Sequence, residues 1–250
     1  MGALSGRTAV VTGGSSGVGL ASARLFAKEG ASVIVVGRDR SRLEAAAGAI
    51  GHGSRWVAAD LGHDPGATAL AARLREMGEE ALDVLFANAG ASNAPELFDT
   101  DEDGFDAVID TNLKSAFFTV LRCFPLLEEG ASVILTSSVS HAMGRVGDPL
   151  YAAAKAGVRS LARGLAARPE FLARRIRVNV LSLGAVATPM TGAGDAAMAE
   201  TLDRWAEDNI PLRRWADPIE AARPALFLAS AASDYMTGAE VAVDGGLAQL

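Results

Sequence analysis

The 250-residue chain has few cysteines, few histidines and no excess of positive charge, and each shortage excludes a class of protein. The single cysteine, Cys123, permits no internal disulfide, and its apolar neighbours favour a buried core thiol. The three histidines (His52, His63 and His141) lack the spacing of metal ligands, so we expect no metal site. The net charge is −7 and no basic run is present, which argues against nucleic-acid binding.

Long hydrophobic runs are also missing. No stretch of about 18 consecutive apolar residues occurs, and the amino terminus has no charged segment followed by a long apolar one. We therefore expect no membrane segment and a cytoplasmic location. Half of the residues are nonetheless hydrophobic, which suits one large domain with a sizeable core.

Short apolar runs alternate with helical patterns along the chain. This alternation indicates βαβ units around a parallel sheet, and no linker or repeat interrupts it, so we predict one α/β domain over residues 1–250. We expect a long helix over about residues 103–127, a last helix from Asp217 that Pro224 kinks, and a polar, partly helical insertion at about 188–211. The expected strands are Thr8–Thr12, Ser32–Val36, Arg55–Ala59, Leu82–Ala87, Ser132–Ser137, Arg177–Leu181 and Glu240–Val243.

The first expected strand runs directly into a glycine-rich turn, Thr12-Gly-Gly-Ser-Ser-Gly-Val-Gly19. Its glycines let the backbone approach a pyrophosphate closely, and the amino terminus of the following helix favours negative charge. The spacing is G-x-x-x-G-x-G instead of the more widespread G-x-G-x-x-G. A tight turn without a ligand also uses glycines, but this position at the start of a βαβ unit favours a dinucleotide cofactor.

Tyr151 and Lys155 form a second candidate site. They share one face of a helix that Asp148 caps and Pro149 begins. A phenol has a pKa of about 10, so its use as a base near neutral pH requires stabilising the phenolate by roughly 4 kcal/mol. One positive charge about 4 Å away, in an effective dielectric near 20, supplies roughly that much. Such pairs also occur by chance on solvated helices, so a catalytic role for this pair is indicated only together with the other motifs.

Together these motifs resemble the short-chain dehydrogenase/reductase family over nearly the whole chain. The resemblance implies a Rossmann-type, doubly wound parallel sheet flanked by helices, a nicotinamide cofactor, and hydride transfer between an alcohol and a ketone or aldehyde. It also implies a small-molecule carbonyl or alcohol substrate and a homo-oligomer, most often a tetramer. The matching positions are Thr12-Gly-(x)3-Gly17-x-Gly19, Asp60, Asn88-Ala-Gly90, Asn112, Ser138, Tyr151, Lys155, Asn179 and Val243-Asp-Gly-Gly246.

The resemblance implies a catalytic set of Asn112, Ser138, Tyr151 and Lys155. We expect Ser138 to hydrogen-bond the substrate oxygen and Tyr151 to exchange a proton with it. Lys155 is expected to lower the pKa of Tyr151 and to hold the nicotinamide ribose. The Asn112 amide is able to anchor a water molecule that links Lys155 to solvent.

Neighbouring polar residues have alternative interpretations. Ser137 and Ser140 are expected to make structural hydrogen bonds. Asn88 is expected to shape a turn and contact cofactor, and Asp60 either contacts adenine or only caps a helix. The cofactor contacts implied by the resemblance are Gly13, Ser15, Ser16, Gly17, Val18, Gly19, Arg38, Asp60, Leu61, Asn88, Ala89, Gly90, Tyr151, Lys155, Gly184, Val186 and Thr188.

The end of the second expected strand predicts which cofactor is preferred. An NAD site places a carboxylate there, but this chain has Gly37, with Arg38 next. Gly37 leaves room for a 2′-phosphate that Arg38 can bind through charge-assisted hydrogen bonds, so we predict NADP(H), with NAD as the second choice. Asp39 follows at once and is the alternative partner for the ribose.

The substrate pocket is expected between Ala91–Pro95, Val139–Val146 and the 188–211 insertion, which we expect to act as a lid. In the insertion, Met190, Met198 and Trp205 either line the pocket or pack a lid helix. His141 and Arg145 either contact substrate or lie in solvent.

Two alternative functions stay open: an NAD-preferring alcohol dehydrogenase, and a cofactor-sensing protein that keeps the fold without turnover. The sequence also departs from the family at Leu183, where relatives usually carry proline before Gly184. It departs again at Ala87, where an additional asparagine often precedes Asn-Ala-Gly.

Overall fold

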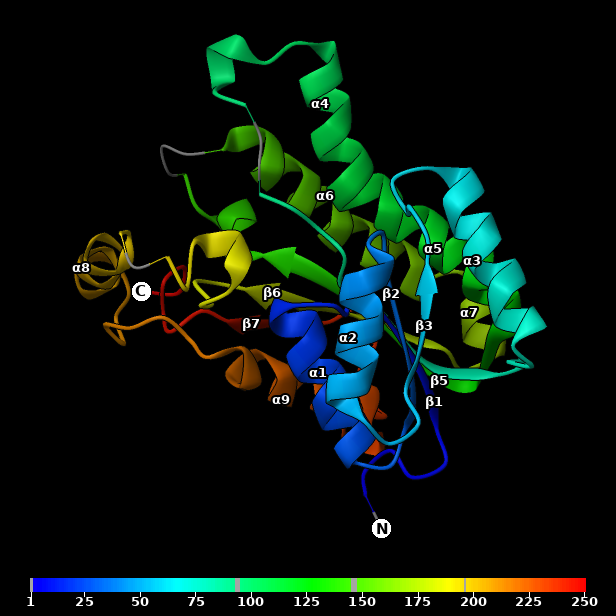
Figure 1. The fold of residues 1–250 in the computed structure, drawn as a ribbon. Helices are drawn as coiled ribbons and strands as arrows, with labels where there is room; N and C mark the ends of the chain where they lie inside the picture. Colours follow the sequence, from blue (N-terminus) through cyan, green and yellow to red (C-terminus); the bar gives the residue numbers. More distant parts are fainter. Residues whose placement is uncertain (1, 93–94, 145–147, 196) are drawn as a thin grey trace.

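The computed structural model describes residues 2–92, 95–144, 148–195 and 197–250. Within these residues, seven parallel strands form a sheet in the order β3-β2-β1-β4-β5-β6-β7 (Figure 1). The order reverses between β1 and β4, which makes the sheet doubly wound, as predicted. The strands are β1 (Thr8–Thr12), β2 (Ser32–Gly37), β3 (Arg55–Ala58), β4 (Leu82–Ala87), β5 (Leu127–Ser138), β6 (Arg177–Leu183) and β7 (Glu240–Val243).

Helices cover both faces of the sheet. α1 (Gly17–Lys28), α2 (Arg40–Ile50) and α9 (Pro218–Ala229) pack on one face, and α3 (Asp64–Glu76), α5 (Ser115–Cys123) and α6 (Pro149–Ala166) on the other. Successive strand residues alternate between the two faces, so Val10 belongs to one core cluster while Ala9 and Val11 belong to the other. Coverage on both sides explains why the strands read as continuous apolar runs.

The long helix expected over residues 103–127 is wrong in two respects. The structure divides it into α4 (Glu102–Ile109), one π-helical turn η2 (Asp110–Lys114), and α5. The helical region ends in a single turn, η3 (Phe124–Leu126), because Pro125 has no N–H group to continue the helix. Leu127 already belongs to β5, where it pairs with Leu82, so this strand begins five residues before Ser132.

Cys123 lies at the end of α5 and is fully buried, as the sequence predicted. Burial raises the pKa of its thiol to about 12, which leaves the sulfur uncharged and unreactive.

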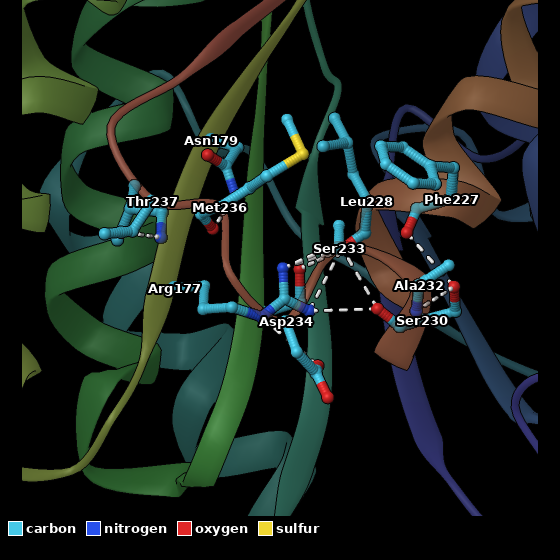
Figure 2. Close-up of polar contacts among 12 residues, drawn as sticks. Arg177, Asn179, Phe227, Leu228, Ser230, Ala232, Ser233, Asp234, Met236 and Thr237 are labelled. Atoms are coloured by element: carbon cyan, nitrogen blue, oxygen red, sulfur yellow. Dashed lines mark hydrogen bonds and ion pairs between the residues drawn. The ribbon is translucent and has the colours of Figure 1, made fainter.

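Arg177, at the start of β6, holds the carboxyl end of α9 on the sheet (Figure 2). Its Nη1 donates to the Leu228 carbonyl at 3.2 Å and to the Ser233 hydroxyl at 2.8 Å, and its Nη2 donates to the Ser230 carbonyl at 3.2 Å. The last carbonyls of a helix have no partner within the helix, so the buried guanidinium acts as a cap. α9 continues through Pro224 as one helix.

Asn179, also in β6, fixes the segment that leads into β7. Its Nδ2 donates to the Met236 carbonyl at 2.8 Å, and its Oδ1 accepts from Ala239 N at 3.1 Å. This family-motif residue therefore has a structural role in the described part of the chain. No described helix has the length and hydropathy needed to cross a membrane.

Candidate active site

A cavity of about 510 Å³ lies at the carboxyl ends of the strands where the strand order reverses. Crevices at such switch points are the usual ligand sites of open α/β sheets. All the cofactor and catalytic positions predicted from the sequence line this cavity, except Gly19 and Asn112. The structure therefore brings together residues from seven separate segments of the chain.

The glycine turn after β1 forms one wall. Gly13 and Gly17 have φ angles of +65° and +52°, a region that side-chain-bearing residues rarely adopt. A Cβ atom on Gly19 would lie 2.3 Å from the Gly13 carbonyl oxygen, so Gly19 is required for packing within the turn and does not line the cavity. Gly19 therefore has a packing role within the turn, and its contact with cofactor stays a prediction.

α1 begins at this turn, and its first residues lie at the cavity. Ser16 is the N-cap residue, yet its side chain makes no capping hydrogen bond. The first N–H groups of α1 are therefore not used by that side chain, and a helix amino terminus of this kind suits a phosphate group. The glycine turn forms a cradle, and this glycine cradle together with the amino terminus of α1 fits the pyrophosphate of a dinucleotide.

Thr12 joins the glycine turn to the end of β4. Its hydroxyl oxygen accepts hydrogen bonds from Asn88 N at 3.0 Å and Ala89 N at 2.9 Å. The Asn88 amide donates in return to the Thr12 carbonyl at 3.1 Å. Asn88 therefore shapes the turn, as expected, while Thr12 was not assigned a role from the sequence although it stands inside the glycine motif.

The end of β2 forms the outer edge of the cavity. Asp39 caps α2: its Oδ1 accepts from Ser41 Oγ at 2.7 Å and from Arg42 N at 3.1 Å, and these bonds lower the pKa of the carboxyl. Arg38 and Arg42 both line the cavity, and the charge of Arg42 contributes to the lowered pKa of Asp39. Arg42 therefore lies at the cavity as well as at the start of α2.

Asp60 follows β3 at the same edge. Its Oδ1 accepts from Gly62 N at 3.2 Å, while the N-cap of α3 is His63. The alternative in which Asp60 only caps a helix is therefore wrong, because it stabilises the loop before α3.

Ser138, Tyr151 and Lys155 lie on the inner side of the cavity. Ser138 ends β5, and the other two are in α6, which begins as predicted with Asp148 as cap: its Oδ1 accepts from Tyr151 N at 2.8 Å. The Lys155 ammonium donates to the Thr136 carbonyl at 3.2 Å and lies 5.5 Å from the centroid of the Tyr151 ring.

The pKa values of the pair correct one expectation. Burial raises the pKa of Tyr151, a hydrogen bond from Ser138 lowers it and the Asp148 charge raises it, so the net change is upward. Burial also lowers the pKa of Lys155 to about 8. The expected lowering of the Tyr151 pKa by Lys155 is not found in these residues alone, because burial has the largest effect and Lys155 is not among the groups that shift this pKa.

Asn112 occupies the π-helical turn, where it is buried. Its Nδ2 donates to the carbonyls of Ala91 at 2.9 Å and Val108 at 3.0 Å, and its Oδ1 accepts from Ala91 N at 3.2 Å. Both amide hydrogens are thus committed to the backbone. The side chain positions the loop after β4 and leaves only one acceptor lone pair for a water molecule.

Gly90 brings Asn112 and Lys155 together. A Cβ atom at Gly90 would lie 3.0 Å from Asn112 Oδ1 and 3.1 Å from Lys155 Nζ. The glycine therefore provides the space in which these two polar groups approach the backbone.

The two serines beside Ser138 make structural bonds, as expected. Ser137 Oγ donates to the Lys155 carbonyl at 2.8 Å and ties β5 to α6. Ser140 Oγ donates to Ser138 Oγ at 3.0 Å.

His141 is neither in solvent nor at the cavity. Its side chain is 7% exposed and its Nε2 lies 2.5 Å from Glu240 Oε1. The loop fold turns the ring toward β7, which the local sequence did not indicate. Arg145 and Val146, like Asn93 and Ala94, lie outside the described residues.

Leu183 does not loosen the loop that follows it. It belongs to β6, where it pairs with Val243, and Gly184 N donates to the Val243 carbonyl at 2.9 Å. Sheet pairing fixes the backbone where proline is expected. A Cβ atom at Gly184 would lie 2.4 Å from Asp244 Cβ, so glycine is needed there for close packing.

Residues 188–211 contain the turn η5 (Pro189–Thr191) and α8 (Ala199–Asn209). Met190 lines the cavity, whereas Met198 does not, and Trp205 packs against Trp215 with ring centroids 5.3 Å apart. Met190 thus lines the cavity, which was one of the two alternatives for this residue, whereas Trp205 packs within the protein, which was the other.

No group of three or more potential metal-ligating side chains occurs among the described residues. A doubly wound sheet with a glycine cradle and a helix amino terminus at its switch point defines an α/β protein of the dinucleotide-binding class.

Comparisons with known proteins specify the family. Residues 13–248 match the family described as Enoyl-(Acyl carrier protein) reductase. The oxidoreductase asL5 of Sarocladium schorii is 40% identical over 252 residues, 99% of this chain and 98% of that protein. The 3-oxoacyl-acyl-carrier-protein reductase FabG of Chlamydia pneumoniae is 37% identical over 98% of each chain.

A solved structure agrees. L-sorbose reductase from Gluconobacter frateurii, complexed with NADPH and L-sorbose, superimposes with a TM-score of 0.91 at 29% identity, over 100% of this chain and 99% of that one. The chain belongs to the short-chain dehydrogenase/reductase family and is an oxidoreductase.

Proposed function

We propose that the chain is an NADP(H)-dependent oxidoreductase that interconverts a ketone or aldehyde and the corresponding alcohol. The observation that carries this proposal is that Ser138, Tyr151 and Lys155 line the same cavity as the glycine cradle and Arg38. A bound nicotinamide supplies or accepts the hydride. The catalytic groups and the cofactor-binding groups therefore share one crevice.

Ser138 and Tyr151 act on the substrate oxygen. In the reducing direction Tyr151 donates its proton to that oxygen, and in the oxidising direction it accepts the proton. Ser138 donates a hydrogen bond to the same oxygen and stabilises its developing negative charge. The raised pKa of Tyr151 keeps the phenol protonated near neutral pH, which is the form that donates a proton in the reducing direction.

Lys155 stays mostly protonated at neutral pH, since burial lowers its pKa only to about 8. Its charge is in place to hold the cofactor ribose and to stabilise the phenolate once the proton has left. Asn112 supports this arrangement through its three bonds to the backbone, with Oδ1 beside Lys155 across Gly90.

The preference for NADP(H) rests on Arg38 and Asp39. Asp39 lines the cavity too, but its Oδ1 is engaged in capping α2, which leaves only Oδ2 for an adenosine ribose. Arg38 and Arg42 both line the cavity and can bind a 2′-phosphate through charge-assisted hydrogen bonds. The L-sorbose reductase that shares the fold was solved with NADPH, which supports the same choice.

We assign the substrate side of the cavity to Ser92, Pro189, Met190 and Thr191. Residues 188–211 act as a lid, with η5 at the cavity and α8 behind it. The test is a hydride-transfer screen in which purified protein, NADPH or NADH and a set of carbonyl compounds are followed by nicotinamide absorbance. Cofactor binding without turnover of any compound would instead support the non-catalytic alternative.

A further inference from the structure

Three side chains from separate elements meet beside the turn that follows Ser138. His141 lies in η4 (Val139–Ala142), Glu240 begins β7, and Arg159 lies in α6. Glu240 Oε1 is 2.5 Å from His141 Nε2, and Oε2 pairs with Arg159 Nε. One carboxylate therefore joins three elements that are distant in the sequence.

The Glu240 side chain is 19% exposed and both of its oxygens are engaged. Burial by itself raises the pKa of a carboxyl, but hydrogen bonding and the charges of His141 and Arg159 lower the pKa of Glu240 overall. The carboxylate is thus held in its charged form by Ser182 as well as by His141 and Arg159.

The position of these residues relative to the site suggests their use. η4 starts directly after Ser138, which is its N-cap residue, and Arg159 is one helical turn beyond Lys155. None of His141, Arg159 and Glu240 is among the described residues that line the cavity. They belong to or contact η4 and α6, the elements next to Ser138 and Lys155, and they lie outside the cavity.

η4 also sets the direction of the hydrogen bond made by Ser138. Ser140 N donates to Ser138 Oγ at 3.3 Å, and Ser140 Oγ donates to it at 3.0 Å. A hydroxyl has two acceptor lone pairs and one donor hydrogen. Because Ser140 occupies both lone pairs, the Ser138 hydrogen remains to be donated, consistent with the hydrogen bond that lowers the Tyr151 pKa.

We propose that Glu240 is a positioning residue, which clamps η4 to α6 through His141 and Arg159 so that Ser138 donates its hydrogen to the reacting oxygen. This inference rests on the proposed function, because it concerns how the same site is kept in order. Loss of the carboxylate leaves the buried His141 ring without its hydrogen-bond partner, and movement of η4 is the means by which the ring regains one.

The sheet does not need this side chain. β7 pairs with β6 through its backbone, with Glu240 opposite Val180, so the strand keeps its pairing when the carboxylate is changed. A change at this position is therefore expected to alter catalysis more than folding.

The test compares Glu240→Gln with Glu129→Gln. Glu129 pairs with Arg175 at 2.6 Å near the opposite end of β5, with a side chain 57% exposed, and serves as the matched control. We expect kcat of Glu240→Gln to fall about tenfold or more, since small displacements at a catalytic group have effects of this size. KM for NADPH should stay within about threefold, because the clamp lies off the cofactor cradle.

A second pair of variants covers the case in which Glu240→Gln does not fold. His141→Ala removes the donor and should lower kcat similarly, whereas His141→Gln keeps an N–H group and should recover most of the activity. A merely structural role predicts no such recovery at equal thermal stability. In a double-mutant cycle, the effects of His141→Ala and Glu240→Gln should be less than additive, because both break one contact.

The outcomes separate this inference from the proposed function. If wild-type protein turns over no carbonyl or alcohol substrate, the proposed function is wrong. If wild type is active and Glu240→Gln matches Glu129→Gln in kcat, or His141→Gln is as impaired as His141→Ala, the positioning role is wrong while the function stands.

Discussion

The Asp39 carboxylate accepts a hydrogen bond from the main-chain N–H of Arg42, 3.1 Å away, and thereby closes the first turn of α2. This contact bears on the two interpretations of the β2 end, a site for NADP(H) or a site for NAD(H). One oxygen of Asp39 is engaged by Ser41 and Arg42, and the proposed preference for NADP(H) assigns the choice of cofactor to the neighbouring Arg38.

Arg38→Ala should therefore lower kcat/KM for NADPH by about ten- to a hundredfold, the loss expected for one charge-assisted contact, and leave kcat/KM for NADH nearly unchanged. The measurement is steady-state kinetics with both cofactors. Arg40→Ala is the control, since Arg40 does not line the cavity. A wild-type preference for NADH, or unchanged selectivity in Arg38→Ala, would contradict the prediction.

Tyr151→Phe should reduce kcat by about 10²- to 10⁴-fold, the usual contribution of a positioned proton donor, while cofactor affinity stays close to that of wild type. The ring packs equally well without its hydroxyl. Tyr235, which is fully exposed, offers Tyr235→Phe as the control. Retention of more than about half of the activity by Tyr151→Phe would remove Tyr151 from the proposed mechanism.

Lys155 should make stability rise with pH. Its pKa is 10.5 in the unfolded chain and about 8 when folded, so between these values the unfolded state binds more protons. The raised pKa of Tyr151 keeps the phenol protonated over this range. The free energy of unfolding, measured by denaturant titration without cofactor, should increase between about pH 7.5 and 9.5.

Two variants test whether Lys155 causes the increase in the free energy of unfolding. Lys155→Met should abolish the contribution of this residue, whereas Lys28→Met, at an exposed position of α1, should keep it. Parallel pH dependence in wild type and Lys155→Met would show that the lysine is not the cause.

Gly90→Ala should lower kcat by about tenfold, because the added methyl group displaces Asn112 Oδ1 or Lys155 Nζ by a few tenths of an ångström. Gly48→Ala is the matched control: nothing lies within 4 Å of its Cβ position in α2, and alanine there should stabilise the helix by about 1 kcal/mol. Equal kcat values in the two variants would show that the absence of a side chain at Gly90 is not required for catalysis.

The oligomer predicted from the resemblance, most often a tetramer, has a candidate surface on α5 and at the carboxyl terminus. Phe117 and Leu121 of α5 are 41% and 46% exposed, and Leu250 is 96% exposed at the carboxyl terminus. Multi-angle light scattering should show a tetramer, and Phe117→Asp should reduce its mass. A monomer at micromolar concentration would refute the assembly.

Much of this fold was readable from the sequence because parallel strands produce uninterrupted apolar runs. All seven strands were predicted, and boundary errors concentrate where tertiary contacts decide. Leu127 joins β5 only because Leu82 lies beside it, and the π-helical turn at Asn112 has no signature of its own in the local pattern.

Most residues predicted for the site stand in family motifs with fixed spacing, and the structure places them around one cavity, while their roles stay predictions. The direction of the Tyr151 pKa shift was not predicted. It depends on how deeply the side chain is buried, which the spacing of Tyr151 and Lys155 in the sequence does not reveal. The pairing of His141 with Glu240 was also missed: the two residues are 99 positions apart and only the folded chain brings them together.

The double hydrogen bond to Thr12 Oγ1 has a consequence for ligand uptake. Since one hydroxyl anchors the amides of Asn88 and Ala89, contacts within the protein join the carboxyl ends of β1 and β4. We expect these contacts to order this part of the cavity without cofactor, so that binding need not bear the entropic cost of ordering it. Amide hydrogen exchange at Asn88 and Ala89 should already be slow in the cofactor-free protein.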